Sequence, residues 1–492
     1  MHLSVCHLQK NRGVISVTAL VFAAVFVMVL TGLLSNIVSQ RQVQVAKEQG
    51  DQALEIADAG LDYYKWFLAH FPNDMQDGTG AAGPYVHDYA DPEGGSLGKF
   101  SLAVTGKYQC GGLSRVNITS TGWTNANPGL KKIVSGAYGR PTVGEYSYIL
   151  NSDVWAGADR IISGPYHSNG GIRMDGTNYA QVTSAKTTWS CTSSFGCSPT
   201  QTKNGVFGGG SGSALWSFPV PLVDFGGVTL KLGDMKNMTA STTPGVCAGG
   251  QTYGCYFPAS GGSNKGYHAV FLNDGRMDLY KVTATRSTGE YNSSTGNQTE
   301  HNLIRTQVLV AGSPFTLPTA CPMVFVEDKL WIDGTVKGKI SIAAADLGAT
   351  DPDLILSGNI DYTTLSGSDG LLAIGENRVL VSLDSPNDMT IRGIFIAQKG
   401  YFGRNYINTN PNGSPFGGTF CASGWDACRF RNSMTIYGTV VSNGRVGTKW
   451  LPTGQGYNTR IDSYDSRLAN DPPPLTPNIS DQYKFLKWTQ DK

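Results

Sequence analysis

The sequence predicts an α+β protein. We expect a long N-terminal transmembrane and amphipathic α-helix, followed by a mainly β domain that forms a β-solenoid (β-helix) with an inserted loop-rich region. An uncharged apolar run fills residues 14–38, and a stripe of small and apolar residues at helical spacing continues to about residue 71. Beyond about residue 95, short alternating runs are broken by turn residues, and Gly, at 62 of 492 residues, is well above its usual share of ~7%.

The apolar run is long enough to cross a membrane. Between Val14 and Val38 no residue is charged, and 15 of these 25 residues are Val, Ile, Leu or Phe. As a helix they would span about 37 Å, against a hydrocarbon core of ~30 Å. Residues 1–13 form a basic leader whose Lys10 and Arg12 keep the N-terminus in the cytoplasm. We therefore expect a single-pass inner (cytoplasmic) membrane protein with an extracytoplasmic β domain.

A cleaved secretory signal peptide is the alternative interpretation of this run. Its apolar region is normally 7–15 residues long and ends at a small-residue cleavage site. Here the run is longer, and residues 39–42 offer no such site, so a retained anchor is favoured. The helical stripe runs from Ala46 through Ala53, Ala57, Leu61 and Tyr64 to Leu68, and Pro72 then ends the helix. Residues 14–71 are therefore predicted to be one transmembrane and stalk helix that packs against neighbours.

These motifs resemble a known family. Lys10 to Val14, the apolar run and Ala53 to Leu61 look like the N-terminal region of PilX-type pilus assembly proteins, which are minor pilin-like components of type IV pili. The Pro-rich stretches at 219–225 and 464–477 look like PilX-type proteins with β-helical ectodomains.

The resemblance implies that a prepilin peptidase cuts between Gly13 and Val14. It also implies that the helix packs among other pilin-like subunits and membrane lipid, in the membrane or in a surface pilus. Thr18 stands where major pilins usually carry Glu, a carboxylate that helps to dock each subunit. K-type pseudopilins, which are placed at the filament tip, share this absence.

A self-match organises the β region. Residues 162–172 align without gaps to residues 436–446 on the pattern Ile-x-Gly-x-apolar-x-Ser-Asn-Gly-x-apolar. Shorter relatives of this phrase recur at intervals that suit the rungs of a solenoid, with Asn-Gly pairs as corners; a β-sandwich with coincidental Gly spacing is the alternative. Beyond the helix we divide the chain into five segments. They are a junction with first strands (72–144), first β rungs (145–183), an insertion with Cys-stapled loops (184–320), the solenoid core (321–450) and a Pro-rich C-terminal tail (451–492).

The cysteines predict disulfides in an oxidising compartment. Cys6 precedes the apolar run and eight cysteines follow it. Zinc is disfavoured because no CxxC spacing or His cluster occurs. Six of the eight form close pairs and the remaining two pair by elimination: Cys191 with Cys197, Cys247 with Cys255, Cys421 with Cys428, and Cys110 with Cys321.

The sequence carries no catalytic motif, and we predict a non-enzymatic protein without cofactor or metal. It has neither a Gly-x-Ser-x-Gly elbow nor a Walker loop. His167 is the best candidate for a ligand or base, but its repeat counterpart is Val441, which favours a structural role. The oxygen-rich loops at 351–353 and 384–388 are calcium candidates that match no calcium motif, and turns favour the same residues. Lys+Arg (38) nearly cancel Asp+Glu (37), which predicts no nucleic-acid partner.

The preferred function is that of a pilin-like minor component of a type IV pilus or related pseudopilus. It would act in pilus assembly and priming, or as a tip-exposed adhesive module toward surface polysaccharide or a host or abiotic surface. The alternative is a membrane-tethered β-helix that binds or cleaves polysaccharide. Its candidate residues are stacked charges and exposed aromatic rings: Asp333, Lys337, Lys339, Asp361 and Arg392, with Trp331, Tyr362, Tyr401, Phe402 and Tyr437.

Overall fold

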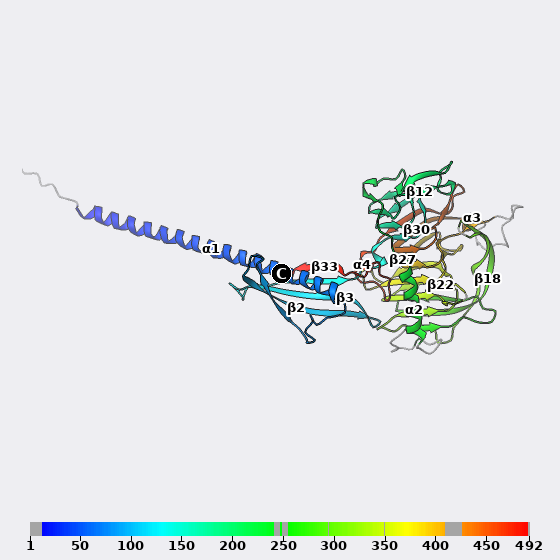
Figure 1. Cartoon of the computed structure of the whole chain (residues 1–492), viewed down its shortest axis with the longest axis horizontal. Helices are drawn as coiled ribbons and strands as arrows, with labels where there is room; N and C mark the ends of the chain where they lie inside the picture. The colour runs from blue at the N-terminus through cyan, green and yellow to red at the C-terminus, as the bar shows by residue number, and fades with distance from the viewer. Residues whose placement is uncertain are drawn as a thin grey trace, which may run out of the picture. The chain divides into compact units, whose positions relative to one another are not determined.

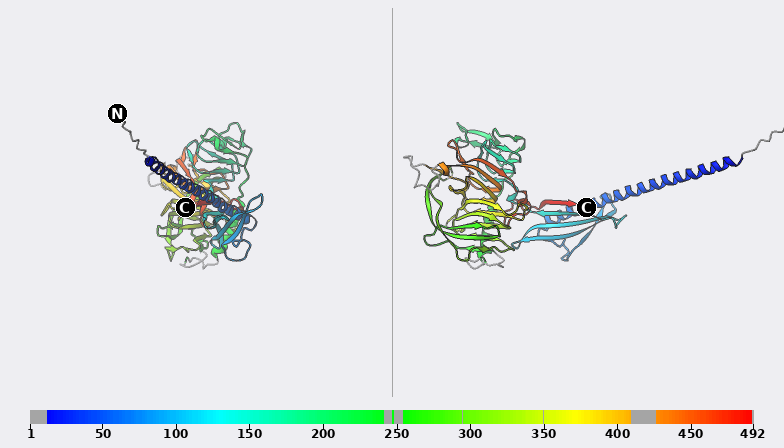
Figure 2. Two further views of the ribbon diagram at one scale, coloured as in Figure 1. Left: turned by 90° about the vertical axis from the view of Figure 1, so that its left-hand side faces the viewer. Right: turned by 180° about the vertical axis from the view of Figure 1, so that it is seen from behind.

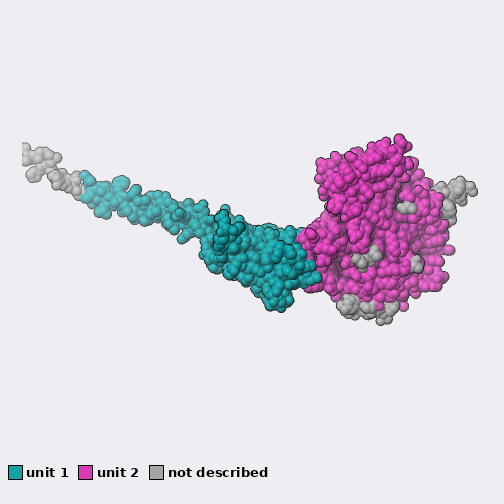
Figure 3. All heavy atoms as spheres, viewed as in Figure 1, with its two compact units in different colours: residues 1–106, 116–138, 485–492 teal, residues 107–115, 139–484 magenta. Residues whose placement is uncertain are grey.

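The computed structural model describes residues 12–240, 247, 254–293, 295–348, 350–408 and 426–490. The chain divides into two compact units (Figure 3). Unit 1 comprises residues 1–106, 116–138 and 485–492, and unit 2 comprises residues 107–115 and 139–484. A long apolar N-terminal helix is followed by mainly β structure, which confirms the predicted order of the chain.

Unit 1 is a helix packed on one β-meander, a sheet in which successive strands are neighbours. Helix α1 (Arg12–His70) ends two residues before Pro72, as predicted. The second half of α1 lies against a five-stranded sheet (Figure 1). The sheet order is β1 (Tyr85–Ala90), β2 (Ser96–Gln109), β3 (Gly112–Thr124), β4 (Lys132–Gly139) and β33 (Lys484–Gln490).

The helix approaches this sheet closely because small residues line the contact. The predicted stripe is buried from Ala53 onward, whereas Ala46 is exposed. A Cβ at Gly122 of β3 would press against the main chain of Ala53 and Ala57. The hydroxyl of Tyr138 on β4 donates a hydrogen bond of 2.7 Å to the main-chain oxygen of Leu61. Glycine in the sheet therefore permits backbone contact that no side chain allows.

Unit 2 is built from ladders of parallel strands, stacked one beside the next in Figures 1 and 2. One ladder joins, in spatial order, β16 (Cys255–Phe257), β21 (Met323–Val326), β23 (Lys339–Ala344), β25 (Gly370–Gly375), β27 (Asp388–Ala397), β30 (Phe430–Ser442), β5 (Tyr148–Leu150), β8 (Tyr166–Ser168), β11 (Val182–Ser184) and β15 (Trp216–Ser217).

Further parallel ladders run beside it. A second joins β17 (Tyr267–Phe271), β22 (Leu330–Val336), β24 (Leu354–Tyr362), β27, β30, β32 (Gln455–Ser463), β7 (Arg160–Ile162) and β10 (Thr177–Asn178). Strands β26 (Val379–Val381) and β28 (Phe402–Gly403) stack on β24, and β6 (Val154–Ala156), β9 (Ile172–Met174) and β14 (Val206–Phe207) form another stack. Parallel stacking is what a solenoid needs, and closure of its coils stays a prediction.

The two copies of the repeated phrase lie in the same columns of these ladders. Val441 pairs with Ile149, which pairs with His167. At the corner that follows, the side-chain amide of Asn169 donates to Asn151 at 2.8 Å, and that of Asn151 donates to Asn443 at 2.7 Å. The Asn-Gly pairs of the two copies therefore stack through a ladder of asparagine side chains. Its middle member, Asn151, lies outside the residues of the self-match.

The predicted insertion at 184–320 differs from the structure. Four of its strands, β14, β15, β16 and β17, belong to the parallel ladders. The chain winds from β5 to β15, crosses by helix α2 (Gly226–Ala240) to the other end, and winds back from β16 to β30, which pairs with β5. The excursions from the ladders are α2 and two antiparallel hairpins: β12 (Thr188–Cys191) with β13 (Gln201–Asn204), and β18 (Arg276–Asn292) with β19 (Gly296–Leu309).

The predicted Pro-rich tail at 451–492 also contains ordered structure. It holds β32 of unit 2 and β33 of unit 1, because its alternating residues pair with neighbouring strands despite the prolines between them. The Asn273-Asp274-Gly275 hairpin signal is confirmed by the antiparallel pairing of β17 with β18. The remaining short elements are η1 (Val143–Glu145), η2 (Ser193–Phe195), η3 (Ser213–Leu215), β20 (Phe315–Thr316), β29 (Tyr406–Ile407), α3 (Asp426–Arg429), β31 (Lys449–Trp450) and α4 (Ser466–Asn470).

Two faces of the ladders are buried. On one face, apolar residues of successive strands form the core of unit 2. On the other, Leu232 and Met235 of α2 pack with Phe325, Ile374 and Ile396. Side chains on both faces of a strand are therefore removed from water, as in parallel sheets generally.

Disulfides join cysteines within unit 2. The bonded pairs are Cys110 with Cys321, Cys191 with Cys197, and Cys247 with Cys255, the pairings that their positions in the sequence led us to expect. Cys428 is also disulfide-bonded, while Cys421, its expected partner, lies outside the described residues.

We expect Gly122→Ala to destabilise unit 1 by about 1–3 kcal/mol, because the added methyl group overpacks the contact with α1. Gly129→Ala is the matched control, since only a side-chain atom of Asn127 lies near its Cβ position, at 3.6 Å. Chemical unfolding of both variants in detergent measures the difference. Equal unfolding midpoints would show that the helix does not depend on this close approach.

Candidate functional site

The largest unpartnered apolar surface in the described chain is the first half of α1. Every Val, Ile, Leu, Met and Phe side chain from Ile15 to Val38 is at least 41% exposed. By length and composition, this helix is long and apolar enough to cross a membrane. Burying such a side chain contributes about 1.5–3 kcal/mol. The surface therefore requires lipid or other apolar helices around it.

The residues expected to govern processing and docking lie at the start of this helix. Residues 1–11 of the leader lie outside the described residues, and the main chain of Gly13 and Val14 falls within α1. The hydroxyl of Thr18 donates to the main-chain oxygen of Ile15 at 3.2 Å. Because its own helix satisfies this hydroxyl, Thr18 places no ionisable group in the apolar surface. Cleavage after Gly13 stays a prediction.

His167 occupies a structural position. It is 2% exposed, and its Nδ1 and Nε2 lie 2.9 and 3.0 Å from Thr183 Oγ1 and Asn169 Oδ1. Burial lowers the pKa of the imidazole, an effect that the Asn169 contact partly offsets. Both ring nitrogens thus have hydrogen-bond partners within the fold. His167 lies in the same ladder column as Ile149 and Val441.

The charges proposed for a polysaccharide site are mostly paired with one another or with nearby groups. Asp361 and Arg392 come together at 2.5 Å on neighbouring strands. Asp333 lies 3.0 Å from His268, and Lys339 binds Asp471. The structure therefore brings one of the proposed pairs together and not the whole set.

The proposed sugar-stacking rings are mainly core residues. Trp331, Tyr362, Tyr401 and Phe402 are at most 7% exposed, while Tyr437 is half-buried. The carboxylates of the two calcium candidates are engaged by protein groups, as Asp353 is by Arg378 and Asp388 by Ser433. Across the described ranges, no group of three His, Cys, Asp or Glu residues has the geometry of a metal site.

Unit 2 contains a cavity of about 260 Å³ that the sequence did not indicate. We call it the aromatic pocket, because three rings line it, those of Trp155, Tyr291 and Trp450. These residues stand more than 130 positions apart on three different strands, so no local motif marks them. Its charged lining residues are Arg445, Lys449, Arg460 and Asp159.

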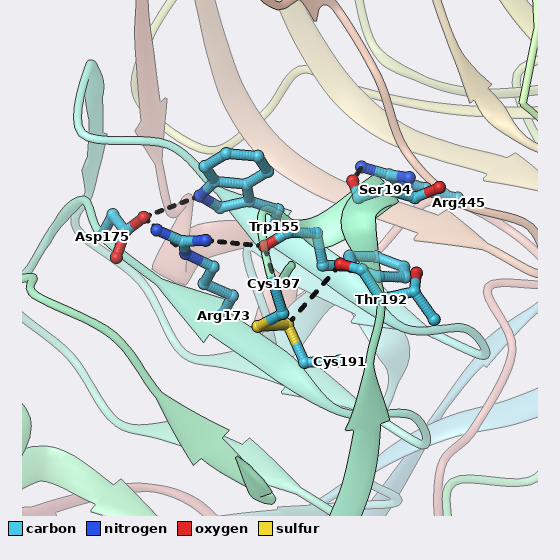
Figure 4. Close-up of a disulfide and its surroundings, with 9 residues drawn as sticks. Trp155, Arg173, Asp175, Cys191, Thr192, Ser194, Cys197 and Arg445 are labelled. Atoms are coloured by element: carbon cyan, nitrogen blue, oxygen red, sulfur yellow. Dashed lines mark hydrogen bonds and ion pairs between the residues drawn. A yellow bond between two sulfur atoms is a disulfide. The ribbon is translucent and has the colours of Figure 1, made fainter. Parts of the chain in front are cut away.

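The disulfide loop 191–197 positions one wall of this pocket (Figure 4). The guanidinium of Arg445 lies 4.3 Å from the ring centre of Phe195 and donates to the Ser194 main-chain oxygen at 2.9 Å. The main-chain oxygen of Phe195 accepts from Arg173 at 2.7 Å, and Arg173 lies 4.3 Å from the ring of Trp155. The loop therefore ties a cation and an aromatic side chain to one rigid element.

The three cations of the pocket differ in how they are neutralised. Arg460 donates two hydrogen bonds of 2.9 Å to Asp159, and Lys449 donates to the main-chain oxygen of Asn458 at 3.0 Å and lies 3.8 Å from Asp159. Among the described residues, no carboxylate forms an ion pair with Arg445. Burial lowers the pKa of Arg445, and its interactions with Tyr291 and Asp153 offset this only in part.

Comparisons with known proteins give a structural likeness. No protein-family model and no curated protein matches the sequence. Among solved structures, the chain is similar to the competence-associated pilin ComZ from Thermus thermophilus, at 10% identity and a TM-score of 0.33, over 90% of this chain and 98% of that one.

We expect His167 to make folding stability fall at acidic pH. Its folded pKa lies below the unfolded value of ~6.5, so only the unfolded chain takes up a proton as the pH drops past that value. The free energy of unfolding should then fall by up to about 1.4 kcal/mol per pH unit below ~6.5, and should be unaffected by His167 above it. Urea unfolding across pH 5–8 should show this loss in the wild type and not in His167→Val.

The exposed His301 provides the control for this experiment. His301→Gln should keep the pH dependence of the wild type. If His167→Val and His301→Gln show the same slope, the buried imidazole does not stay neutral in the folded protein.

Proposed function

We propose that this protein is a pilin-like minor component of a type IV pilus or related pseudopilus. The observation that carries the proposal is α1, one continuous helix whose first half is apolar and exposed and whose second half is packed on the sheet of unit 1. A simple tether needs neither this length nor this continuity. A helix that moves from lipid into a bundle of like helices needs both.

Packing supplies the mechanism of this proposed role. The uncharged surface from Ile15 to Val38 is equally suited to hydrocarbon chains and to the apolar surfaces of neighbouring subunits. The leader before it, with Lys10, Arg12 and Gly13, resembles a prepilin leader, which supports a prepilin peptidase and membrane lipid as partners. We propose the inner membrane as the site of insertion and a surface pilus as the destination.

The residue at position 18 supports a specialised subunit within such a filament. A Glu at this position would bring a buried charge that needs a partner in the neighbouring subunit. Thr18 instead satisfies its hydroxyl within its own helix. A subunit without the docking carboxylate is suited to priming assembly or to the filament tip. A subunit at the tip contacts neighbouring subunits on one side only.

Unit 2 supports an adhesive role in the same protein. Its parallel ladders are consistent with a β-solenoid, and its disulfides stabilise loops outside the cytoplasm. Such a module can display loops at the ends of its strands while its core stays rigid. We therefore propose that unit 2 is the part that meets a surface.

The N-terminus of the mature protein tests whether residues 1–13 are a prepilin leader. Mass spectrometry of the mature protein should find Val14 at the N-terminus in a strain with its own prepilin peptidase. Gly13→Leu should keep the leader, because it replaces the Gly before the proposed cut with a large side chain, whereas Gly32→Ala should be processed normally. An intact Met1 in the wild type, or a cut beyond Val38, would contradict the proposal.

Replacing the apolar helix tests assembly separately from anchoring. We expect gene deletion to lower the number of surface pili, as counted by electron microscopy. A chain in which residues 14–38 are exchanged for an unrelated transmembrane helix should insert into the membrane but fail to restore pili. Leu33→Ile is the matched control, because it keeps the volume and polarity of the surface. Full restoration by the exchanged helix would show that residues 14–38 serve only as an anchor.

A further inference from the structure

We propose that the aromatic pocket of unit 2 binds an acidic sugar residue of a surface polysaccharide. The inference deepens the proposed adhesive role by naming the chemical class of its ligand. Three features of the pocket carry it: fixed aromatic rings, one cation without a carboxylate partner among the described residues, and an adjoining second cavity.

Two of the three rings are held in place by hydrogen bonds at their edges, and the third packs against one of them. The indole N–H of Trp155 donates to Asp175 at 2.8 Å, and that of Trp450 donates to the main-chain oxygen of Arg404 at 2.8 Å. Tyr291 stands edge-on to Trp450 with ring centres 5.8 Å apart, and its side chain is 36% exposed. Rings fixed in this way lose little conformational freedom on binding, and they offer apolar surface to the C–H face of a sugar.

Arg445 supplies the charge recognition. A guanidinium has five N–H donors, and for Arg445 the described residues account for one hydrogen bond, to Ser194. Stacking on Phe195 fixes its plane without neutralising it. A planar carboxylate is the group that matches such a fork, through two parallel hydrogen bonds. An acidic sugar combines this carboxylate with a ring that stacks on the aromatic side chains.

The surroundings of the pocket favour a polymer over a single small molecule. A second cavity of about 380 Å³ is lined by Gly444, which directly precedes Arg445, and by Lys399 and Tyr401. Consecutive residues therefore line the two cavities, so a chain of sugars bound in one continues toward the other. At about 260 Å³ the aromatic pocket itself is smaller than sites for drug-sized ligands, which suits one ring.

Nucleic acid fits the same surface less well. Binding a nucleic-acid strand requires several cations along the phosphate backbone. In the pocket, Arg460 is already paired with Asp159, and in the second cavity Lys399 is paired with Asp351 and Glu376. Lys449 also lies near Asp159, at 3.8 Å, so among the described residues Arg445 is the pocket cation without a carboxylate at ion-pair distance, and it matches one carboxylate per bound sugar.

The test uses the full-length protein in detergent and three acidic oligosaccharides: oligogalacturonate, hyaluronan fragments and oligosialic acid. Each is compared with its methyl ester, which keeps the sugar chain and removes the charge. We expect at least one acid to quench the tryptophan fluorescence and to bind about tenfold or more tightly than its ester. The proposal fails if no acid binds more tightly than its ester, or if single-stranded DNA competes for the pocket and binds more tightly.

Variants assign the binding to the pocket. Arg445→Gln should weaken binding of the acid by about tenfold or more and leave binding of the ester unchanged. Tyr291→Ala should weaken the binding of both. The matched controls are Arg305→Gln and Tyr179→Ala, at exposed positions of unit 2 that do not line the pocket. Equal affinity of the pocket variants and the controls would overturn the assignment. Circular dichroism and disulfide mapping verify that each variant is folded.

Counting surface pili separates this inference from the proposed function. The pocket variants should assemble pili at the wild-type number and lose only the binding of the acidic sugar. Normal sugar binding by a protein with an exchanged helix, together with lost pili, would keep both proposals. Binding without any effect of gene deletion on pili would overturn the pilus assignment and leave the sugar site standing.

Discussion

Register between parallel strands is the constraint on which unit 2 depends. Each short strand buries its side chains only when the strands on both sides place matching residues in the same column. One such column runs through Val324, Ile342, Ala373, Phe395 and Val440, and all five are fully buried. The small Ala373 lies beside the large Phe395, so the volume is balanced along the column and not within each strand. A slip of one residue would move every side chain to the opposite face.

The same stacking explains where binding groups can arise. Within a ladder, most side chains are committed to packing, as the buried Trp331 and Phe402 show. Loops that leave the ladders are free of that constraint. The aromatic pocket is lined partly from such excursions, with Tyr291 on the long β18 hairpin and Arg445 beyond the end of β30, and partly by Trp155 on the short strand β6. Rigid strands thus position side chains whose identity the fold does not dictate.

Local patterns in the sequence predicted the parts of this protein that are themselves local. The uncharged run, the helix end before Pro72 and the Asn-Gly corners each depend on a few neighbouring residues, and the structure contains them. The chain path was beyond such reasoning, because β5 stacks on β30 across nearly 300 residues and no spacing rule reports that contact. The pocket was missed for the same reason. Trp155, Tyr291 and Trp450 share a cavity only because the fold brings β6, β18 and β31 together.

Polar contacts specify the seam where the two windings of unit 2 meet. Asp462 lies in a column between Ile436 and Ile162, where an apolar residue would be expected. Its carboxylate accepts from Arg160 Nε at 2.9 Å and from the hydroxyl of Tyr148 at 2.8 Å, and both partners come from the other winding. Burying Asp462 alone would be costly, since breaking a buried ion pair costs about 3–5 kcal/mol. The strand β32 is therefore stable next to β7, which supplies the arginine, and not next to a purely apolar strand. Apolar columns make the stack stable, and this buried pair determines which strand closes it.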